Sequence, residues 1–219
     1  RSGPAAEAAL AEVADRWDSD GPEAVTGALE AARALPRLAP AVRARVDVLL
    51  AEAALRAGRL EEADRRFAAL GFFDAALVAG PLDNEGGRGL DLPPGAAEAG
   101  PDGVGPDAPW RGLPPAACRF GRLRAHARIS PRAHRCAVVT ARVESARERS
   151  GVLRLGASGA ARVFWNGSAA LETAPAGAAH PDRHLVRVPL ARGANRLTVE
   201  ICAEEAGVLA QAGFEDAER

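Results

Sequence analysis

An Asn-Gly pair between two alternating apolar segments limits the fold of this chain more than any other feature. It lies in ARVFWNGSAAL, residues 161–171, where Val163 and Trp165 occupy alternate positions before the pair. Alternation is the period of a strand with one buried face. Both central residues of a two-residue hairpin turn need positive φ, which Asn and Gly adopt most easily. The stretch therefore predicts a β-hairpin that turns at Asn166-Gly167.

Further segments alternate in the same way and are separated by turn signals: residues 137–144, 151–157, 184–190 and 195–202. Short strands at this spacing predict an antiparallel β-sandwich or jelly roll, which we place at residues 118–206. We treat residues 207–219 as a C-terminal tail. In the last strand, alternation predicts Leu197, Val199 and Ile201 inward and Arg196, Thr198 and Glu200 outward.

The first 72 residues have the 3.6-residue periodicity of amphipathic helices. Gly21 and Gly58 interrupt it, and Pro22 stands at a first helical turn, where proline is tolerated. We expect helices arranged in two hairpins. Their inward stripes hold Leu10, Val13, Trp17, Val25, Leu29, Val42, Val46, Leu49, Ala53, Leu60, Ala63, Phe67 and Leu70.

The two interrupting glycines lie 37 positions apart (58 − 21), close to the period of about 34 residues of tetratricopeptide repeats. The segment AEAALRAGRLEEADRRFAAL resembles that repeat, with Gly58 at the turn, small Ala63 where the helices approach and Phe67 one turn later. Plain helical hairpins are the alternative. The predicted fold class is α+β multidomain, with TPR-like hairpins over residues 1–72 followed by the sandwich.

Glycine and proline recur every few residues between the two halves, so we interpret residues 73–117 as a linker or wrap. Within it, Asp83, Asn84, Glu85 and Asp91 offer oxygen atoms of the kind that hard cations bind. Their spacing does not follow the twelve-residue calcium loop. We therefore expect a turn whose polar side chains bond to the backbone.

The charge composition excludes some functions. All 28 basic residues are arginine, and 29 acidic residues bring the formal net charge to −1, so the basic surplus of a nucleic-acid-binding protein is missing. No window approaches the roughly 18 consecutive apolar residues of a membrane span. The start, RSGPAAEAAL, has neither an initiator Met nor a signal-peptide pattern, so we expect a mature product or a fragment.

Three cysteines, Cys118, Cys136 and Cys202, lack the spacing of a zinc site. Cys136 opens one predicted strand and Cys202 ends another, so the two can form a disulfide if those strands are neighbours. Buried, unpaired cysteines are the alternative.

Histidines suggest a second metal hypothesis. His180, Asp182 and His184 can gather a divalent ion only if the loop folds back, because four strand residues span about 13 Å. We favour a solvated loop and expect no metal. No nucleophile elbow or metalloprotease motif occurs, so the sequence predicts no catalytic residue and no cofactor.

Two segments, LRLGASGAARVFWNG and PDRHLVRVPLARGANRLTVEIC, resemble the galactose-binding-like β-sandwich that serves as an accessory domain of glycoside hydrolases. More narrowly, the helical repeats, the VAGPLDNEGGRGLD stretch, Trp-Arg-x-Leu-Pro at 110–114 and the sandwich resemble the N-terminal region of bacterial envelope proteins. Those proteins often end in a transglutaminase-like domain. The likeness spans residues 45–202, but Ala137 and Ala194 stand where the family has aromatic residues, which weakens any transfer of function.

The resemblance implies a non-catalytic interaction or scaffolding module of a cell-envelope or periplasmic protein, acting on a protein partner or on a downstream domain of the same chain. In one alternative the sandwich binds carbohydrate, with Trp165 stacking on a sugar ring and Asn166 and Asp182 bonding to its hydroxyls. In another, the chain is the non-catalytic front of a transglutaminase-like or glycoside hydrolase enzyme. An exposed Trp165 would favour the carbohydrate site, and a buried one would count against it.

Overall fold

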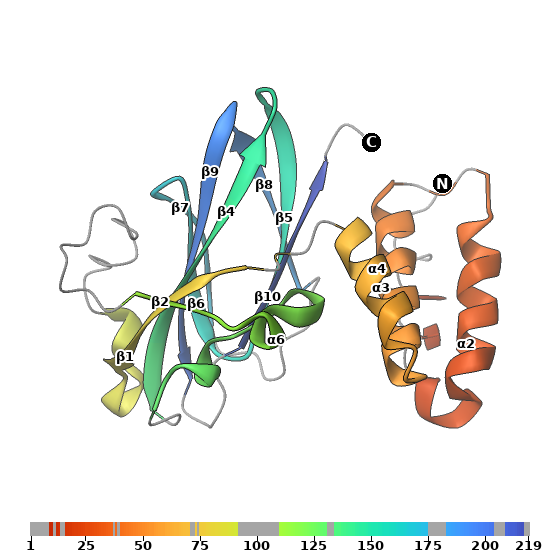
Figure 1. Ribbon diagram of the computed structural model, residues 1–219, viewed down its shortest axis with the longest axis horizontal. Coiled ribbons are helices and arrows are strands. Elements are labelled where there is room, and N and C mark those ends of the chain that lie inside the picture. The colour runs from red at the N-terminus through yellow and green to blue at the C-terminus, as the bar shows by residue number, and fades with distance from the viewer. Residues whose placement is uncertain are drawn as a thin grey trace. The chain divides into compact units, whose positions relative to one another are not determined.

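The computed structural model describes residues 9–10, 12–13, 16–36, 38, 40–70, 73, 75–91, 110–130, 134–174, 183–203 and 209–216 (Figure 1). The chain divides into two compact units, residues 1–72 with Arg219 and residues 73–218, which we describe one at a time. Within the described ranges, no helix is both long enough and apolar enough to cross a membrane.

The first unit is helical and contains α2 (Trp17–Arg33), α3 (Pro40–Arg56) and α4 (Leu60–Ala69). The predicted interruptions are present. Gly21 leaves the helical conformation with φ 77°, so the regular part of α2 begins at Pro22, whose missing N–H is not needed there. Gly58 has φ 74°, and Arg59 N donates to Ala54 O at 2.9 Å, which is the Schellman pattern at the end of α3.

Successive helices of this unit contact each other along the predicted stripes. The buried side chains are Leu10, Val25, Leu29, Val42, Val46, Leu49, Leu50, Ala53, Ala63 and Phe67. Arg66 of α4 pairs with Glu30 of α2 at 2.8 Å, which ties the outer helices across α3. Leu60 differs from the expectation: it is 45% exposed because it is the first residue of α4, before the helix meets α3.

The second unit is a sandwich of two antiparallel sheets, which confirms the predicted α+β architecture at this level. One sheet has the strand order β2-β1-β4-β9-β6-β7 and the other β3-β10-β5-β8. The strands are β1 (Leu77–Asp83), β2 (Arg111–Gly112), β3 (Arg122–Arg124), β4 (Arg135–Ser145), β5 (Arg149–Ala157), β6 (Ala160–Trp165), β7 (Ser168–Thr173), β8 (His184–Leu190), β9 (Gly193–Ala203) and β10 (Leu209–Asp216). Short helical turns are η1 (Glu85–Gly87), η2 (Gly89–Asp91), α6 (Pro115–Cys118), η3 (Arg119–Gly121) and η4 (Ala125–Ala127).

The space between the sheets is filled by the inward side chains that alternation predicts. Leu153, Leu155 and Leu190 come from the four-stranded sheet, and Leu197, Val199 and Ile201 face them from β9. Each of these six side chains is essentially inaccessible to solvent. Leu123 of the short strand β3 joins the same core.

Two boundaries differ from the sequence analysis. Residues 73–117 are not only a connection, because β1 and β2 within them extend the six-stranded sheet beside β4. Residues 207–219 are not a tail, because β10 pairs with both β3 and β5 in the middle of the four-stranded sheet. All three strands are positioned by backbone pairing with strands distant in the sequence, and a local pattern of side chains does not show such pairing.

The outward face of the six-stranded sheet is partly covered. We call residues 84–91, which include η1 and η2, the wrap. Asn84 anchors it: the side-chain carbonyl accepts from Gly89 N at 2.9 Å, and Nδ2 donates to Ala203 O at 3.4 Å. Arg162 of β6 also donates to Leu90 O. Glu200, which is the cross-strand partner of Arg162 and which the alternation directs outward, is only 5% exposed. Thr198, between Thr140 and Phe164 on the same face, is 1% exposed.

Cys136 and Cys202 form a disulfide between directly paired positions of β4 and β9. These are the two cysteines that the sequence analysis considered together. Cys118 is buried and is not part of a disulfide. Gly89 of the wrap lies against the disulfide so closely that a Cβ at this position would overlap Cys136 Sγ. A glycine is therefore required where the wrap passes over the disulfide.

Reduction of this disulfide is expected to lower the free energy of unfolding of the sandwich by about 4 kcal/mol, because the bond closes a loop of 66 residues. Urea unfolding with and without a reductant measures the change, and the Cys136→Ala/Cys202→Ala variant should be insensitive to reductant. Thiol titration of the denatured, unreduced protein should find one free thiol, from Cys118. Three free thiols would contradict the pairing.

Candidate functional site

The strands β4 and β9 extend past their neighbours at one end of the six-stranded sheet. The pairing of β1 with β4 ends at Leu77 and Thr140, and the pairing of β6 with β9 ends at Trp165 and Leu197. Residues 141–145 of β4 and 193–196 of β9 continue as a two-stranded extension. This extension carries polar side chains on the face that the wrap covers elsewhere.

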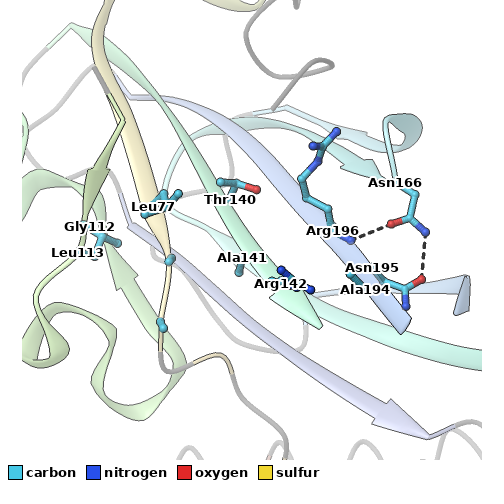
Figure 2. A pocket seen from close by; sticks show the side chains of 12 residues that line it. Leu77, Gly112, Leu113, Thr140, Ala141, Arg142, Asn166, Ala194, Asn195 and Arg196 are labelled. Carbon is cyan, nitrogen blue, oxygen red and sulfur yellow. Dashed lines mark hydrogen bonds between the residues drawn. The ribbon is translucent and has the colours of Figure 1, made fainter. Parts of the chain in front are cut away.

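A groove of about 880 Å³ lies on this extension and beside it. Its polar side chains are Thr140, Arg142, Asn166, Asn195 and Arg196. The other lining residues are apolar or glycine, among them Leu77, Leu113 and Ala141. Figure 2 shows Leu77 on one side and Asn166 on the other, with Thr140, Arg142 and Arg196 between them.

Asn166 and Asn195 brace one wall of the groove. Asn166 has φ 51° and Gly167 φ 83°, as the predicted turn requires. The Asn166 carbonyl accepts from Arg196 N at 2.7 Å, and its Nδ2 donates to Asn195 Oδ1 at 3.0 Å (Figure 2). Asn195 in turn bonds to Ala191 N and Ala191 O, both at 2.8 Å. Both amides are thus held by the protein and join the β6–β7 turn to the connection between β8 and β9.

Trp165 lies in the core between the sheets. It is 3% exposed, and its indole Nε1 donates to Pro189 O at 2.6 Å. An indole with both faces packed offers no surface for a sugar ring, so the stacking role considered for Trp165 does not fit this geometry. Trp165 and Asn166 are neighbours in the sequence but have different environments: Trp165 lies in the core and Asn166 lines the groove.

Beside the groove, the covered part of the same sheet face contains a buried charge cluster. Glu200 and Arg162 are cross-strand partners, with Nη1 and Oε2 3.7 Å apart. Arg162 also pairs with Glu172 at 3.2 Å. Burial raises the pKa of Glu200; the positive charge of Arg162 acts in the opposite direction, and the nearby Glu172 adds to the rise. The cluster joins β6, β7 and β9 to the wrap through Leu90.

The remaining candidates from the sequence are not gathered into a site. Asp182 and His180 lie outside the described residues, while His184 begins β8. Burial, followed by the charge of Arg183, lowers the pKa of His184. Asn84 of the suggested calcium loop is turned into the protein and bonds to the backbone. Among the residues that the structure describes, no His, Cys, Asp and Glu side chains gather in a group that could hold a metal.

Parts of several larger proteins are similar in structure to part of this chain. A β-glucosidase from Kluyveromyces marxianus aligns with a TM-score of 0.41 and 11% identity over 65% of this chain and 16% of the enzyme. A β-glucuronidase from Bifidobacterium dentium aligns with a TM-score of 0.37 and 15% identity over 61% of this chain and 20% of the enzyme. An anti-sigma factor domain-containing protein from Clostridium clariflavum aligns with a TM-score of 0.31 and 7% identity over 37% of this chain and 27% of that protein. The chain thus spans less than a third of the length of each. No family model and no curated protein sequence matches the chain.

Replacing Trp165 with Ala is expected to destabilise the sandwich by about 3–5 kcal/mol, because it empties a core position and removes the bond to Pro189 O. Leu185→Ala on β8 is the matched control, since Leu185 is 58% exposed and should change stability little. Chemical unfolding measures both variants. Equal stability of Trp165→Ala and wild type would show that the indole is not part of the core.

The raised pKa of Glu200 predicts a pH-dependent stability. The folded protein keeps a proton that the unfolded chain releases, so this contribution is complete below the ordinary pKa of glutamate and is lost as the pH rises through the raised value. Urea unfolding of wild type and Glu200→Gln between pH 4 and pH 8 should show wild type losing stability relative to the variant as the pH rises. Glu148→Gln is the control, because Glu148 is exposed and lies outside the cluster. A stability difference independent of pH would contradict the argument.

Proposed function

We propose that the chain is a non-catalytic interaction module whose sandwich binds a protein partner, or a downstream domain of the same polypeptide, in the groove on the six-stranded sheet. The observation that carries the proposal is the lining of the groove. It combines two guanidinium groups, held on paired strands, with an apolar rim that includes Leu77 and Leu113. Arginine and apolar side chains together are typical of protein-binding surfaces.

The lining favours binding over catalysis. The ionisable side chains among the described lining residues are Arg142 and Arg196, and a guanidinium group offers five hydrogen-bond donors and no acceptor. The hydroxyl of Thr140 donates to Leu197 O at 2.9 Å, and the amides of Asn166 and Asn195 bond to each other and to the backbone. These groups support a rigid surface.

A protein ligand fits the groove better than a stacked sugar. No aromatic ring is among the described lining residues, and the nearest tryptophan in sequence, Trp165, faces the core. Sugar-binding sites usually place an aromatic face against the ring. Carbohydrate binding is therefore treated as an outcome of the test.

The disulfide supports the further proposal that the chain works in an oxidising compartment, as an envelope or periplasmic protein does. The helical hairpins of the first unit support a second, TPR-like contact surface, because stacked helical hairpins form extended binding faces. Both belong to the same proposal of an interaction module.

The test compares the wild-type chain with Arg142→Ala/Arg196→Ala in two screens, a phage-displayed peptide library and a glycan array. We expect peptides that bind wild type and are lost in the double variant, and no glycan with that behaviour. Arg122→Ala/Arg187→Ala removes the same charge from the other sheet and should keep the peptides. Glycan binding that is lost in the groove variant, with no peptide selected, would replace the proposal by a carbohydrate-binding module.

A further inference from the structure

The backbone of β4 has an open edge beside the groove. In an antiparallel pair, opposed residues alternate between hydrogen-bonded pairs, with Cα atoms about 5.5 Å apart, and non-hydrogen-bonded pairs, about 4.5 Å apart. The Cα atoms of Cys136 and Cys202 are 4.0 Å apart, so they form a non-hydrogen-bonded pair. The register from there to Ser145 and Gly193 has no shift, so Arg142 and Glu144 also stand in non-hydrogen-bonded pairs.

It follows that the N–H and C=O groups of Arg142 and Glu144 point away from β9, toward the side where β1 pairs with β4. The pairing on that side agrees with this assignment. Leu113 N donates to Ala76 O at 2.9 Å, so Ala76 bonds toward β2 and the next residue, Leu77, bonds toward β4 at Thr140. The backbone groups of Thr140 are therefore bonded to Leu77. The next residues of β4 whose backbone groups point to the same side are Arg142 and Glu144.

No strand within the described ranges pairs with β4 beyond Thr140 on that side. Ala75 and Ala76 line the groove before β1 begins, and the pairing of β1 with β4 starts only at Leu77. The groove thus lies along an edge with backbone donors and acceptors spaced as in a strand. Such an edge is a template for one more strand.

The side chains on this edge select for negative charge. Arg142 and Arg196 are direct cross-strand partners on the same face, and like charges in that position destabilise a sheet. Glu144, beside the groove, pairs with Arg142 at 2.7 Å, which shows that a carboxylate fits against this face of the strand. Carboxylates from a ligand would bring further negative charge to the two neighbouring guanidinium groups and relieve their repulsion.

The other face of the same edge selects for apolar side chains. Val143 is half-buried and packs against the core cluster, next to fully buried Ala141. A strand added along Arg142 and Glu144 would place every second side chain beside Val143 and the intervening ones beside Arg142.

We propose that the groove binds an extended protein segment with alternating acidic and apolar side chains, which adds to β4 as a strand at Arg142–Glu144. The inference rests on the proposed function and specifies its partner. Backbone bonds to the edge of β4 hold the segment, its carboxylates pair with Arg142 and Arg196, and its apolar side chains cover Val143.

The test uses a fluorescein-labelled peptide of alternating Glu and Val and the full chain, with fluorescence anisotropy as the readout. Binding is expected for this peptide and not for its Lys-Val counterpart. Arg142→Ala/Arg196→Ala should weaken binding about tenfold or more, the effect of losing a charged hydrogen bond. Absence of binding by the Glu-Val peptide would overturn the proposal.

Backbone methylation of the peptide separates strand addition from simple charge attraction. Methylating the N–H groups of one alternate set, either all Glu or all Val, should abolish binding, while methylating the other set should leave it nearly unchanged. In a strand, only one set faces the edge of β4. Equal effects of both methylations would overturn the proposal.

Substitutions of Glu144 give a second discrimination. Glu144→Gln removes a negative charge and should strengthen binding of the acidic peptide. Glu144→Pro removes the same charge and also the edge N–H, without touching the ladder to β9, and should weaken binding. Stronger binding by a folded Glu144→Pro variant would count against strand addition.

The two proposals can fail separately. Library peptides that require the two arginines but respond to neither backbone methylation nor Glu144→Pro would retain the interaction module and overturn strand addition. Glycan binding at the groove in place of peptide binding would overturn both.

Discussion

The paired strands β4 and β9 are the constraint on which the rest of the sandwich depends. Their register runs without a shift from Arg135 and Ala203 to Ser145 and Gly193, so the inward face of one strand is locked to that of the other. A slip of β4 by one residue relative to β9 would turn Val139 out of the core and bring Thr140 into it. Strands β1 and β6 attach to the two sides of this pair, and the disulfide closes one end.

The two ends of this pair have opposite surroundings on the same sheet face. At the disulfide end the wrap covers the face and buries Glu200 beside Arg162. At the other end β1 and β6 stop, and Arg142 and Arg196 stand at an open groove. The difference arises because both flanking strands are shorter than β4 and β9. The groove is therefore a result of strand lengths.

The sequence is sufficient for the strands and helices that have a long local pattern. Alternation and Asn-Gly predict β6 and β7, and Gly21 and Gly58 mark the helix ends, because these signals act within a few residues. The same alternation also contains the answer for Trp165. It has the parity of Val163, which places it on the core face, so the stacking hypothesis could have been set aside from the pattern alone.

The groove could not be predicted, because its residues meet only through register. No local sequence pattern relates Arg142 to Arg196, which are more than fifty positions apart. Nor does one show that the first residue of β1, Leu77, lies opposite Thr140. Asn166 is partly predictable: its turn is visible in the sequence, but its bond to Asn195 requires β6 to lie beside β9. The burial of Glu200 likewise depends on the wrap, a segment whose glycines give no periodic pattern.

Gly89 has a consequence for the lifetime of the disulfide. Because the wrap lies directly against Cys136 Sγ and Cys136 is 1% exposed, this sulfur is shielded from a thiolate in solution. Direct thiol attack on Cys136 requires the wrap to lift from the sheet, where Asn84 anchors it. The rate at which a small thiol attacks Cys136 in the native protein would therefore report how often the wrap opens.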